Sequence, residues 1–410
     1  MTGTRSTLAR VTGLAAVAAL VPGVVAEAKP DDGPPRLLGR AVLDVNTYAP
    51  GPTSGNFYTG PQNGITFPTP SQPVEGFSAL VEGRHGEWLA MPDNGFGAKA
   101  NSVDFLIRAY TLRIDFKTVD DDTGGVEVGD FISFRDPNHV IGFPIVNENT
   151  PDRLLTGGDI DPESLQVSPE GDLWVGDEFG PWILHFDDDG TLLEPAIPLP
   201  GDLKSPNNPF LGGATATQPN SRGLEGMGSS GKHLYPILEG ATVADGPAST
   251  RRIMFEYDTH RGEFTGRQWD YRVDPSTPLV ADVAPLDPHR LLVVERDGDS
   301  GVTGAPLDRR VYVVDLRDSG PDGSLVKRQV LDLAAIPDPD GVSLPAIRPG
   351  DVRIGDPFGV ACESVEAIRV ISKDEVLVGC DNNFPNRGRN PDFADDNEFI
   401  VVEVPALTDG

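Results

Sequence analysis

Residues 159–190, DIDPESLQVSPEGDLWVGDEFGPWILHFDDDG, decide the fold. Polar turns rich in Gly, Pro and Asp separate three short apolar runs, at 164–167, 173–176 and 182–186. Runs of this length between such turns are typical of antiparallel β-strands. The turn at 169–171 folds the first two runs into a hairpin and brings Glu163 close to Asp177 and Glu178. Three carboxylates at one end of a hairpin repel one another unless a cation or a basic side chain lies among them.

The same pattern of short strand, turn, apolar strand and acid-rich turn recurs along the chain. Its five copies occupy residues 75–96, 159–190, 222–240, 281–298 and 361–383. An acid opens each copy except the fourth. Their spacing is irregular, but radially repeated small antiparallel sheets fit the pattern best. We therefore expect an all-β fold, a β-propeller with six blades, or seven as the alternative.

Length and composition agree with this fold class. The chain has 410 residues, 47 of them Gly and 39 Pro, and no long stretch has helical periodicity. An α/β fold is the alternative, although its βαβ units would need long helical crossovers. We expect one domain over residues 36–405. A strand near 37–45 is expected to pair with 398–404 and close the ring, which removes exposed sheet edges.

The N-terminus has the pattern of an export signal. Arg5 and Arg10 precede an apolar run at 11–26, and small residues at Ala26 and Ala28 suit cleavage after Ala28. We expect a signal peptide at 1–28 and a flexible lead-in at 29–35. The apolar run is short for a membrane span, so we expect a secreted, monomeric protein without stable membrane insertion.

The formal net charge of −30 bears on the choice of partner. Such a surface repels nucleic acid and anionic lipid, so we expect no nucleic-acid partner. It suits a divalent cation, although acidic residues also keep an exported protein soluble.

Two cysteines, Cys362 and Cys380, flank the fifth repeat. Each lies near the start of one strand of a proposed hairpin. In an oxidising compartment they can form a disulfide. The alternative is a pair of free buried thiols.

The recurrent acids are the candidate metal ligands. Inner strands of a propeller surround its channel, so acids at matching ends would form a ring of carboxylates. Such a ring suits Ca²⁺ or Mg²⁺ rather than zinc. The ligand set predicted from the repeats, including neighbouring polar residues, comprises Glu75, Glu163, Glu225, Glu363, Asp381 and Asn382. Asn94 and Asn383 can add neutral oxygens. Alternatively, each acid caps a turn or pairs with arginine.

Basic residues lie beside the acidic turns, at Arg222, Arg296, Arg387 and Arg389. Guanidinium groups recognise phosphate and carboxylate with two parallel hydrogen bonds. They can equally serve as ion-pair partners of the acids. Other motifs carry no chemistry: residues 226–231 match G-x-G-x-x-G without a strand–helix unit, and neither G-x-S-x-G nor H-E-x-x-H occurs.

Four motifs together resemble a known family. They are DIDPESL from Asp159, WVGDEFGP from Trp174, RGLEGM from Arg222 and DNNFP from Asp381. They resemble the signatures of the phytase-like domain, the "esterase-like activity of phytase" family, and the resemblance spans residues 36–405. It implies a β-propeller and a hydrolase that acts on esters, phosphate esters among them.

We therefore expect metal-assisted hydrolysis of phosphate or carboxylic esters at the mouth of the channel, with phosphate esters ahead. The expected metal ligands are Glu163, Glu225 and Glu363. The candidates for general base are Asp177, Glu178 and Glu239. Arg222 and Arg296 would neutralise developing charge. The alternative is a non-catalytic, calcium-stabilised propeller that presents its loops to a ligand or protein.

Overall fold

The computed structural model describes residues 33–84 and 86–407. The expected signal peptide and the first part of the lead-in lie outside these residues. Apart from one short 3₁₀ helix, η1 (Pro405–Leu407), the regular structure described is β-strand. The all-β expectation is therefore confirmed. In the described residues, no helix is long and apolar enough to cross a membrane.

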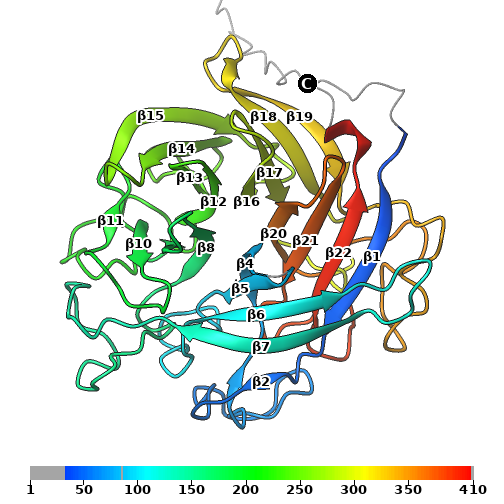
Figure 1. The fold of residues 1–410 in the computed structure, drawn as a ribbon, viewed down its shortest axis with the longest axis horizontal. Coiled ribbons are helices and arrows are strands. Elements are labelled where there is room, and N and C mark those ends of the chain that lie inside the picture. Colours follow the sequence, from blue (N-terminus) through cyan, green and yellow to red (C-terminus); the bar gives the residue numbers. More distant parts are fainter. Residues whose placement is uncertain (1–32, 85, 408–410) are drawn as a thin grey trace, which may run out of the picture.

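Most strands belong to five four-stranded antiparallel units, each of which extends from an inner strand outward (Figure 1). The first unit comprises β4 (Phe77–Glu82), β5 (Trp88–Pro92), β6 (Arg108–Asp115) and β7 (Gly125–Ser133). The second comprises β8 (Pro162–Val167), β9 (Leu173–Asp177), β10 (Trp182–Phe186) and β11 (Ile197–Pro198). The third comprises β12 (Leu224–Ser230), β13 (His233–Leu238), β14 (Arg251–Asp258) and β15 (Glu263–Arg272). The fourth comprises β16 (Leu279–Pro285), β17 (Arg290–Arg296), β18 (Arg309–Ser319) and β19 (Leu325–Asp332). The fifth comprises β20 (Ser364–Val370), β21 (Glu375–Asp381), β22 (Asn397–Glu403) and β1 (Arg36–Leu43). A separate small sheet pairs β2 (Tyr48–Ala49) with β3 (Gln72–Pro73).

The inner strands of the five units form a ring. Strands β4, β8, β12, β16 and β20 contact one another in cyclic order around a central axis (Figure 1). The first and fifth units are joined at their outer edges by one parallel pair, Val42 with Gly125. Together they make an eight-stranded sheet whose two edge strands, β4 and β20, are also in contact, so this sheet nearly closes on itself. The architecture is therefore propeller-like.

The number of units differs from the expected six or seven blades. The segment after the first repeat supplies β6 and β7, the outer strands of the first unit, rather than another unit. In the described part of the chain, only the two-residue strands β2 and β3 lie outside the five units. The five repeats of the sequence thus correspond to the five units.

The apolar core is divided in the same way. The buried apolar side chains form five clusters, and each contains residues of two neighbouring units. Burial of apolar area between the units is the main force that holds them around the axis.

The ring closes through pairing of the two ends of the chain. Strand β1 pairs antiparallel with β22, from Arg36 opposite Glu403 to Leu43 opposite Asn397. The expected pairing of these segments is confirmed. A buried ion pair supports it, because Arg40 Nε lies 2.6 Å from Glu398 Oε1.

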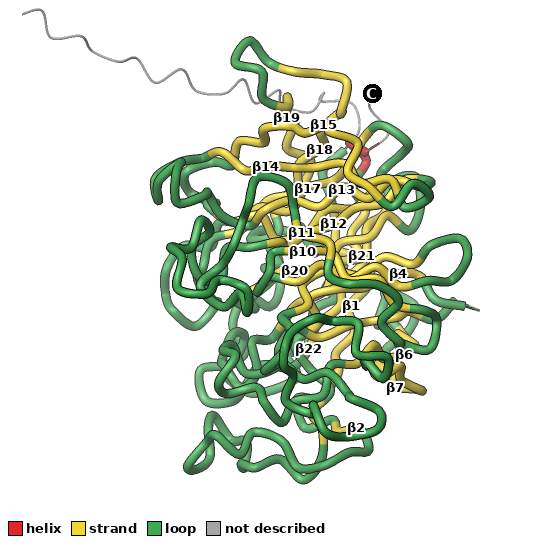
Figure 2. The backbone as a smooth tube through the Cα atoms, turned by 90° about the vertical axis from the view of Figure 1, so that its left-hand side faces the viewer, coloured by secondary structure: helices red, strands yellow, loops and turns green. Residues whose placement is uncertain are grey.

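The two faces of the ring differ in their connections. The hairpins between the first and second strands of the units are short, at 83–87, 168–172, 231–232, 286–289 and 371–374. Long connections lie at the opposite ends of these strands, among them 93–107, 199–223, 297–308, 333–363 and 382–396. Figure 2 shows most of this loop structure gathered on one side of the strands. We call this side the loop face.

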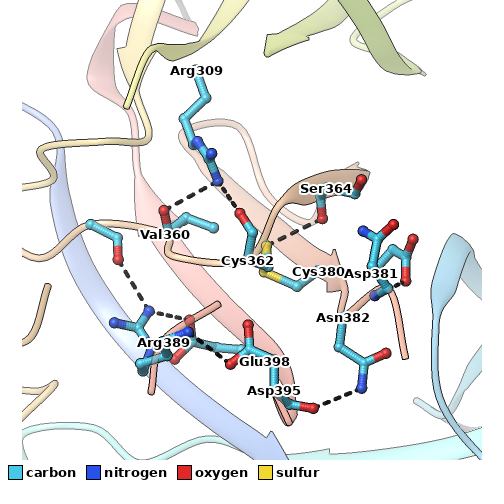
Figure 3. Close-up of a disulfide and its surroundings, with 12 residues drawn as sticks. Arg309, Val360, Cys362, Ser364, Cys380, Asp381, Asn382, Arg389, Asp395 and Glu398 are labelled. Carbon is cyan, nitrogen blue, oxygen red and sulfur yellow. Dashed lines mark hydrogen bonds and ion pairs between the residues drawn. A yellow bond between two sulfur atoms is a disulfide. The ribbon is translucent and has the colours of Figure 1, made fainter. Parts of the chain in front are cut away.

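A disulfide joins Cys362 to Cys380, with 6.1 Å between their Cα atoms (Figure 3). The expected bridge is therefore confirmed, and the alternative of free thiols is wrong. Both cysteines are buried, Cys362 just before β20 and Cys380 within β21. The bridge ties the inner strand of the fifth unit to its neighbour. A disulfide fits a protein of an oxidising compartment.

Replacement of both cysteines by alanine should lower the free energy of unfolding by about 3 kcal/mol, because the bridge closes a loop of 18 residues in the unfolded chain. Urea unfolding of the wild type, the double variant and the reduced wild type measures this loss. The double variant and the reduced wild type should have similar midpoints, both below that of the oxidised protein. Equal midpoints for all three samples would contradict the prediction.

Candidate functional site

Each inner strand carries a β-bulge near its first residues. The ladder with the second strand shifts register there in all five units. A bulge leaves an extra residue outside the regular pairing and redirects its side chain. The residues within these bulges include Ser78, Glu163, Glu225, Ala281 and Glu366. Three of the five inner strands thus place a glutamate at this level.

These glutamates belong to a larger group of carboxylates that we call the acidic cluster. Three sets have ligand oxygens within 4.8 Å of one another: Asp93–Asp161–Glu163, Glu163–Glu225–Glu366 and Glu178–Glu225–Glu239. Because Glu163 and Glu225 are shared, the sets form one continuous cluster of seven carboxyl groups. Asp93, Glu178 and Glu239 follow the second strands of the first three units, which end at the loop face. All members except Asp93 are buried.

Two arginines contact the cluster. Arg296, at the end of β17, places Nη2 at 2.9 Å from Glu366 Oε1, 3.1 Å from Glu239 Oε1 and 3.9 Å from Glu225 Oε1. Burial opposes the charge of Arg296, but these carboxylates outweigh it and raise its pKa above the ordinary value. Arg222 donates from Nη1 to Glu239 Oε2 at 2.9 Å. Two guanidinium groups do not neutralise seven carboxylates, so the cluster has excess negative charge when it is ionised.

Burial and mutual repulsion therefore favour the protonated forms. Burial first, then Glu225 and Asp161, raise the pKa of Glu163 well above its ordinary value. Burial together with Asp161 and Glu239 has the same effect on the pKa of Glu178. Burial raises the pKa of Asp161 to about 6, although hydrogen bonds from Asn94 oppose the shift. Within the cluster, a bound cation or protons can supply the missing positive charge.

Glu75 lies apart from the three sets. Its side chain is fully buried, and neither carboxylate oxygen has a hydrogen-bond partner among the described residues. Burial, followed by the charges of Asp93 and Asp381, raises its pKa well above the ordinary value. A carboxyl group in this environment is favoured in its neutral form.

Glu363 also lies outside the three sets. It is half-buried, and burial raises its pKa while Arg296 opposes the shift. Glu75 and Glu363 each lie three residues before a bulge residue, Ser78 and Glu366 respectively. Alignment of the repeats on these earlier acids missed Glu366. A spacing signal exists, because Glu366 precedes Asp381 by 15 residues, as Glu163 precedes Glu178.

Asp177 has a different environment from Glu178 beside it. Its two oxygens accept backbone N–H bonds from Asp161 and Gly180, both at 2.7 Å, and it is fully buried. Burial outweighs these bonds and raises its pKa to about 8. Asp177 therefore holds the backbone of Asp161 and Gly180, with one backbone bond to each of its oxygens.

The polar residues at the end of β21 and just after it are also hydrogen-bonded. Asp381 accepts from Asn383 N at 2.6 Å, and Asn382 accepts from Gly76 N at 2.9 Å. The amide of Asn382 donates to Asp395 O at 2.8 Å (Figure 3). These bonds anchor the loop 382–396 to the start of the first unit. Nearby, Arg389 is buried in an ion pair with Glu398 and donates to Gly359 O at 3.1 Å (Figure 3).

Comparison with known proteins adds a family match. Residues 72–384, most of the chain, match the family model "Phytase-like: Esterase-like activity of phytase". An "Uncharacterized secreted protein" of Arthroderma benhamiae is 25% identical over 184 residues, 35% of this chain and 35% of that protein. The match thus spans about a third of that relative.

Solved structures show weaker likenesses. A luciferin-regenerating enzyme aligns at a TM-score of 0.37 and 11% identity, over 81% of this chain and 79% of that one. The PQQ-bound aldose sugar dehydrogenase of Streptomyces coelicolor aligns at a TM-score of 0.36 and 11% identity, over 91% of this chain and 100% of that one. Because both TM-scores are low, the fold assignment rests on the strand topology of this chain.

The raised pKa values predict how the stability of the cation-free protein depends on pH. Asp161 and Asp177 have folded pKa values of about 6 and about 8, above the ordinary 3.8. At a pH between the ordinary pKa and the folded pKa of each group, the folded state binds more protons than the unfolded state. The stability of the folded state therefore falls as the pH rises. The melting temperature of cation-free protein should therefore decrease from about pH 4.5 to about pH 8. A melting temperature independent of pH over this range would contradict the expectation.

Proposed function

This chain belongs to the phytase-like family, and from this membership we propose that it is an exported hydrolase of phosphate esters. The reaction takes place at the loop face of a five-bladed β-propeller, with Ca²⁺ or Mg²⁺ in the acidic cluster. The observation that carries the proposal is the cluster itself, seven carboxyl groups against two guanidinium groups. We infer the class of reaction, ester hydrolysis, from the family, and the residues that would perform it from the acidic cluster.

The donor set fits a hard divalent cation. All ligand atoms of the cluster are carboxylate oxygens, which Ca²⁺ and Mg²⁺ prefer. Within each set the carboxylate oxygens lie within 4.8 Å of one another. The two arginines do not balance the negative charge of the seven carboxylates. Glu163, Glu225 and Glu366 would hold the ion, with Asp93 and Asp161 beside them. A bound ion there would orient the ester and stabilise negative charge on its oxygens.

The contacts distinguish the three candidates for general base. Both oxygens of Asp177 accept backbone bonds, and both oxygens of Glu239 face arginines. Glu178 receives one hydrogen bond, from Gly223 N to Oε1 at 3.1 Å. It is therefore the candidate with a carboxylate oxygen available for water, and a cation bound in the cluster would favour its ionised form.

The proposed reaction assigns the remaining roles. Water attacks phosphorus, Glu178 accepts the water proton, and the ester P–O bond breaks as the alcohol oxygen takes a proton from solvent. Arg222, with 39% of its side chain exposed, contacts the phosphoryl oxygens. Arg296 is buried against three glutamates and keeps them in place.

Export and a small-molecule partner complete the proposal. The disulfide and the secreted relative support an extracellular location. The acidic surface does not favour nucleic acid as a partner. We propose a monomer that acts on small phosphate esters.

Hydrolysis of p-nitrophenyl phosphate, bis-p-nitrophenyl phosphate and p-nitrophenyl acetate, with calcium, magnesium or chelator, tests the activity. We expect cation-dependent turnover of a phosphate ester. Glu178→Gln should lower kcat by about 10²-fold or more, because it removes the general base. Most of its cation-induced rise in melting temperature should persist, because Glu178 is not among Glu163, Glu225 and Glu366, which would hold the ion. Full turnover in Glu178→Gln would exclude this base. No turnover of any ester, together with cation-dependent melting, would favour the non-catalytic binding module.

A second test concerns the cation. Glu366→Gln should reduce the rise in melting temperature that calcium or magnesium gives to the wild type, because one charged ligand is lost. Glu363→Gln is the matched control and should retain most of the rise, since Glu363 lies outside the cluster. Equal effects of both variants would contradict the assignment of Glu366. A wild type that melts at the same temperature with calcium, magnesium and chelator would show that the cluster holds no cation.

A further inference from the structure

We propose that Lys99 and Arg222 form the two cationic ends of a rim that binds one phosphoryl group beside the acidic cluster. The proposal rests on the proposed function and names the residues that select its substrate. A phosphoryl group carries a charge of about −1.5 to −2 at neutral pH, which two cations match. The ligand class is therefore a phosphate monoester or inorganic phosphate.

Lys99 comes from the loop 93–107, and its positive charge opposes the raised pKa of Asp159 and of Asp177, the residue before Glu178. Its Nζ is 5.1 Å from the centroid of the Phe179 ring, and Phe179 directly follows Glu178. The side chain is half-exposed. The amine of Lys99 is thus held over the ring of the residue that follows Glu178.

The loop 199–223 connects Lys99 to Arg222 by a series of hydrogen bonds. Lys99 Nζ donates to Asn207 O at 3.5 Å, and Asn207 Nδ2 donates to Asn220 Oδ1 at 3.1 Å. Asn220 Nδ2 then donates to Ser221 Oγ at 3.0 Å, and Arg222 donates to Ser221 O. Gly223, the next residue, donates to Glu178. The rim therefore runs alongside the general base proposed above.

The amine of Lys99 has more N–H donors than it has hydrogen-bond acceptors among the described residues. An ammonium group offers three N–H donors, and the contacts of the described residues give it one acceptor, Asn207 O. No carboxylate of the described residues forms an ion pair with Lys99. Lys204, in the same loop as Asn207, instead pairs with Asp202 at 2.7 Å. Lys99 thus differs from Lys204 in having no carboxylate within ion-pair distance among the described residues, although its charge acts on Asp159 and Asp177.

Electrostatics explain why such a rim is needed. The chain has a net charge of −30, and the cluster adds its own repulsion toward an anionic substrate. Arg296 is buried and already contacts three glutamates. Lys99 and the exposed part of Arg222 are the positive groups that the rim presents to an incoming phosphoryl group.

Calorimetric titration of inorganic phosphate into the protein with magnesium tests the rim directly. Lys99→Met should weaken phosphate binding about tenfold or more, since a charge-assisted hydrogen bond is lost. Lys99→Arg should retain most of the affinity. Lys204→Met, the matched control, should bind like the wild type. All variants should melt within a few degrees of the wild type without phosphate, which shows that they fold.

The outcomes separate this proposal from the proposed function. Phosphate binding that depends on Lys99, with no ester hydrolysis, supports the rim and overturns the hydrolase. Ester hydrolysis with the same KM and phosphate affinity in the wild type and Lys99→Met overturns the rim and leaves the hydrolase. A wild type that binds no phosphate also overturns the rim. Equal weakening in Lys99→Met and Lys204→Met would show a non-specific charge effect and overturn it as well.

Discussion

Repulsion among buried carboxylates is the constraint on which the centre of this molecule depends. Seven carboxyl groups lie together where the inner strands meet the loop face, and two arginines compensate them only in part. Unpaired charge in a buried site is strongly unfavourable, so the folded state must bind protons or a cation there. The raised pKa values of Glu163, Glu178 and Glu225 express this cost as proton binding.

The surrounding architecture tolerates that repulsion because it is closed and rigid. Five apolar clusters bind each unit to its neighbours. The β1–β22 pairing joins the two ends of the chain, and the disulfide ties β21 to the segment before β20. A site built on such strands keeps its geometry better than one built on loops alone. The bulges add the local irregularity that directs Glu163, Glu225 and Glu366 into the cluster.

The loops carry the parts of the site that contact a substrate in the proposed function. Lys99 belongs to the loop 93–107, and Asn207 and Arg222 belong to the loop 199–223. The strands supply negative charge and the loops supply positive charge, so an anionic ester would meet a cation-loaded cluster on one side and the rim on the other. This separation lets substrate preference change through the loops while the cluster stays the same.

The sequence by itself determined the class of fold, the positions of the five repeats, the closing pair of strands and the disulfide. These features depend on local patterns, because two-residue alternation and turn residues are visible in a short segment. Glu163 and Glu225, two of the acids that it singled out, do lie in the acidic cluster. Only the tertiary structure decided that there are five units, that Glu366 rather than Glu363 joins the cluster, and that Asp177 is engaged by backbone amides. The physical reason is that strand register and cyclic packing join residues that are far apart in the chain, and these depend on partners that a single segment does not contain.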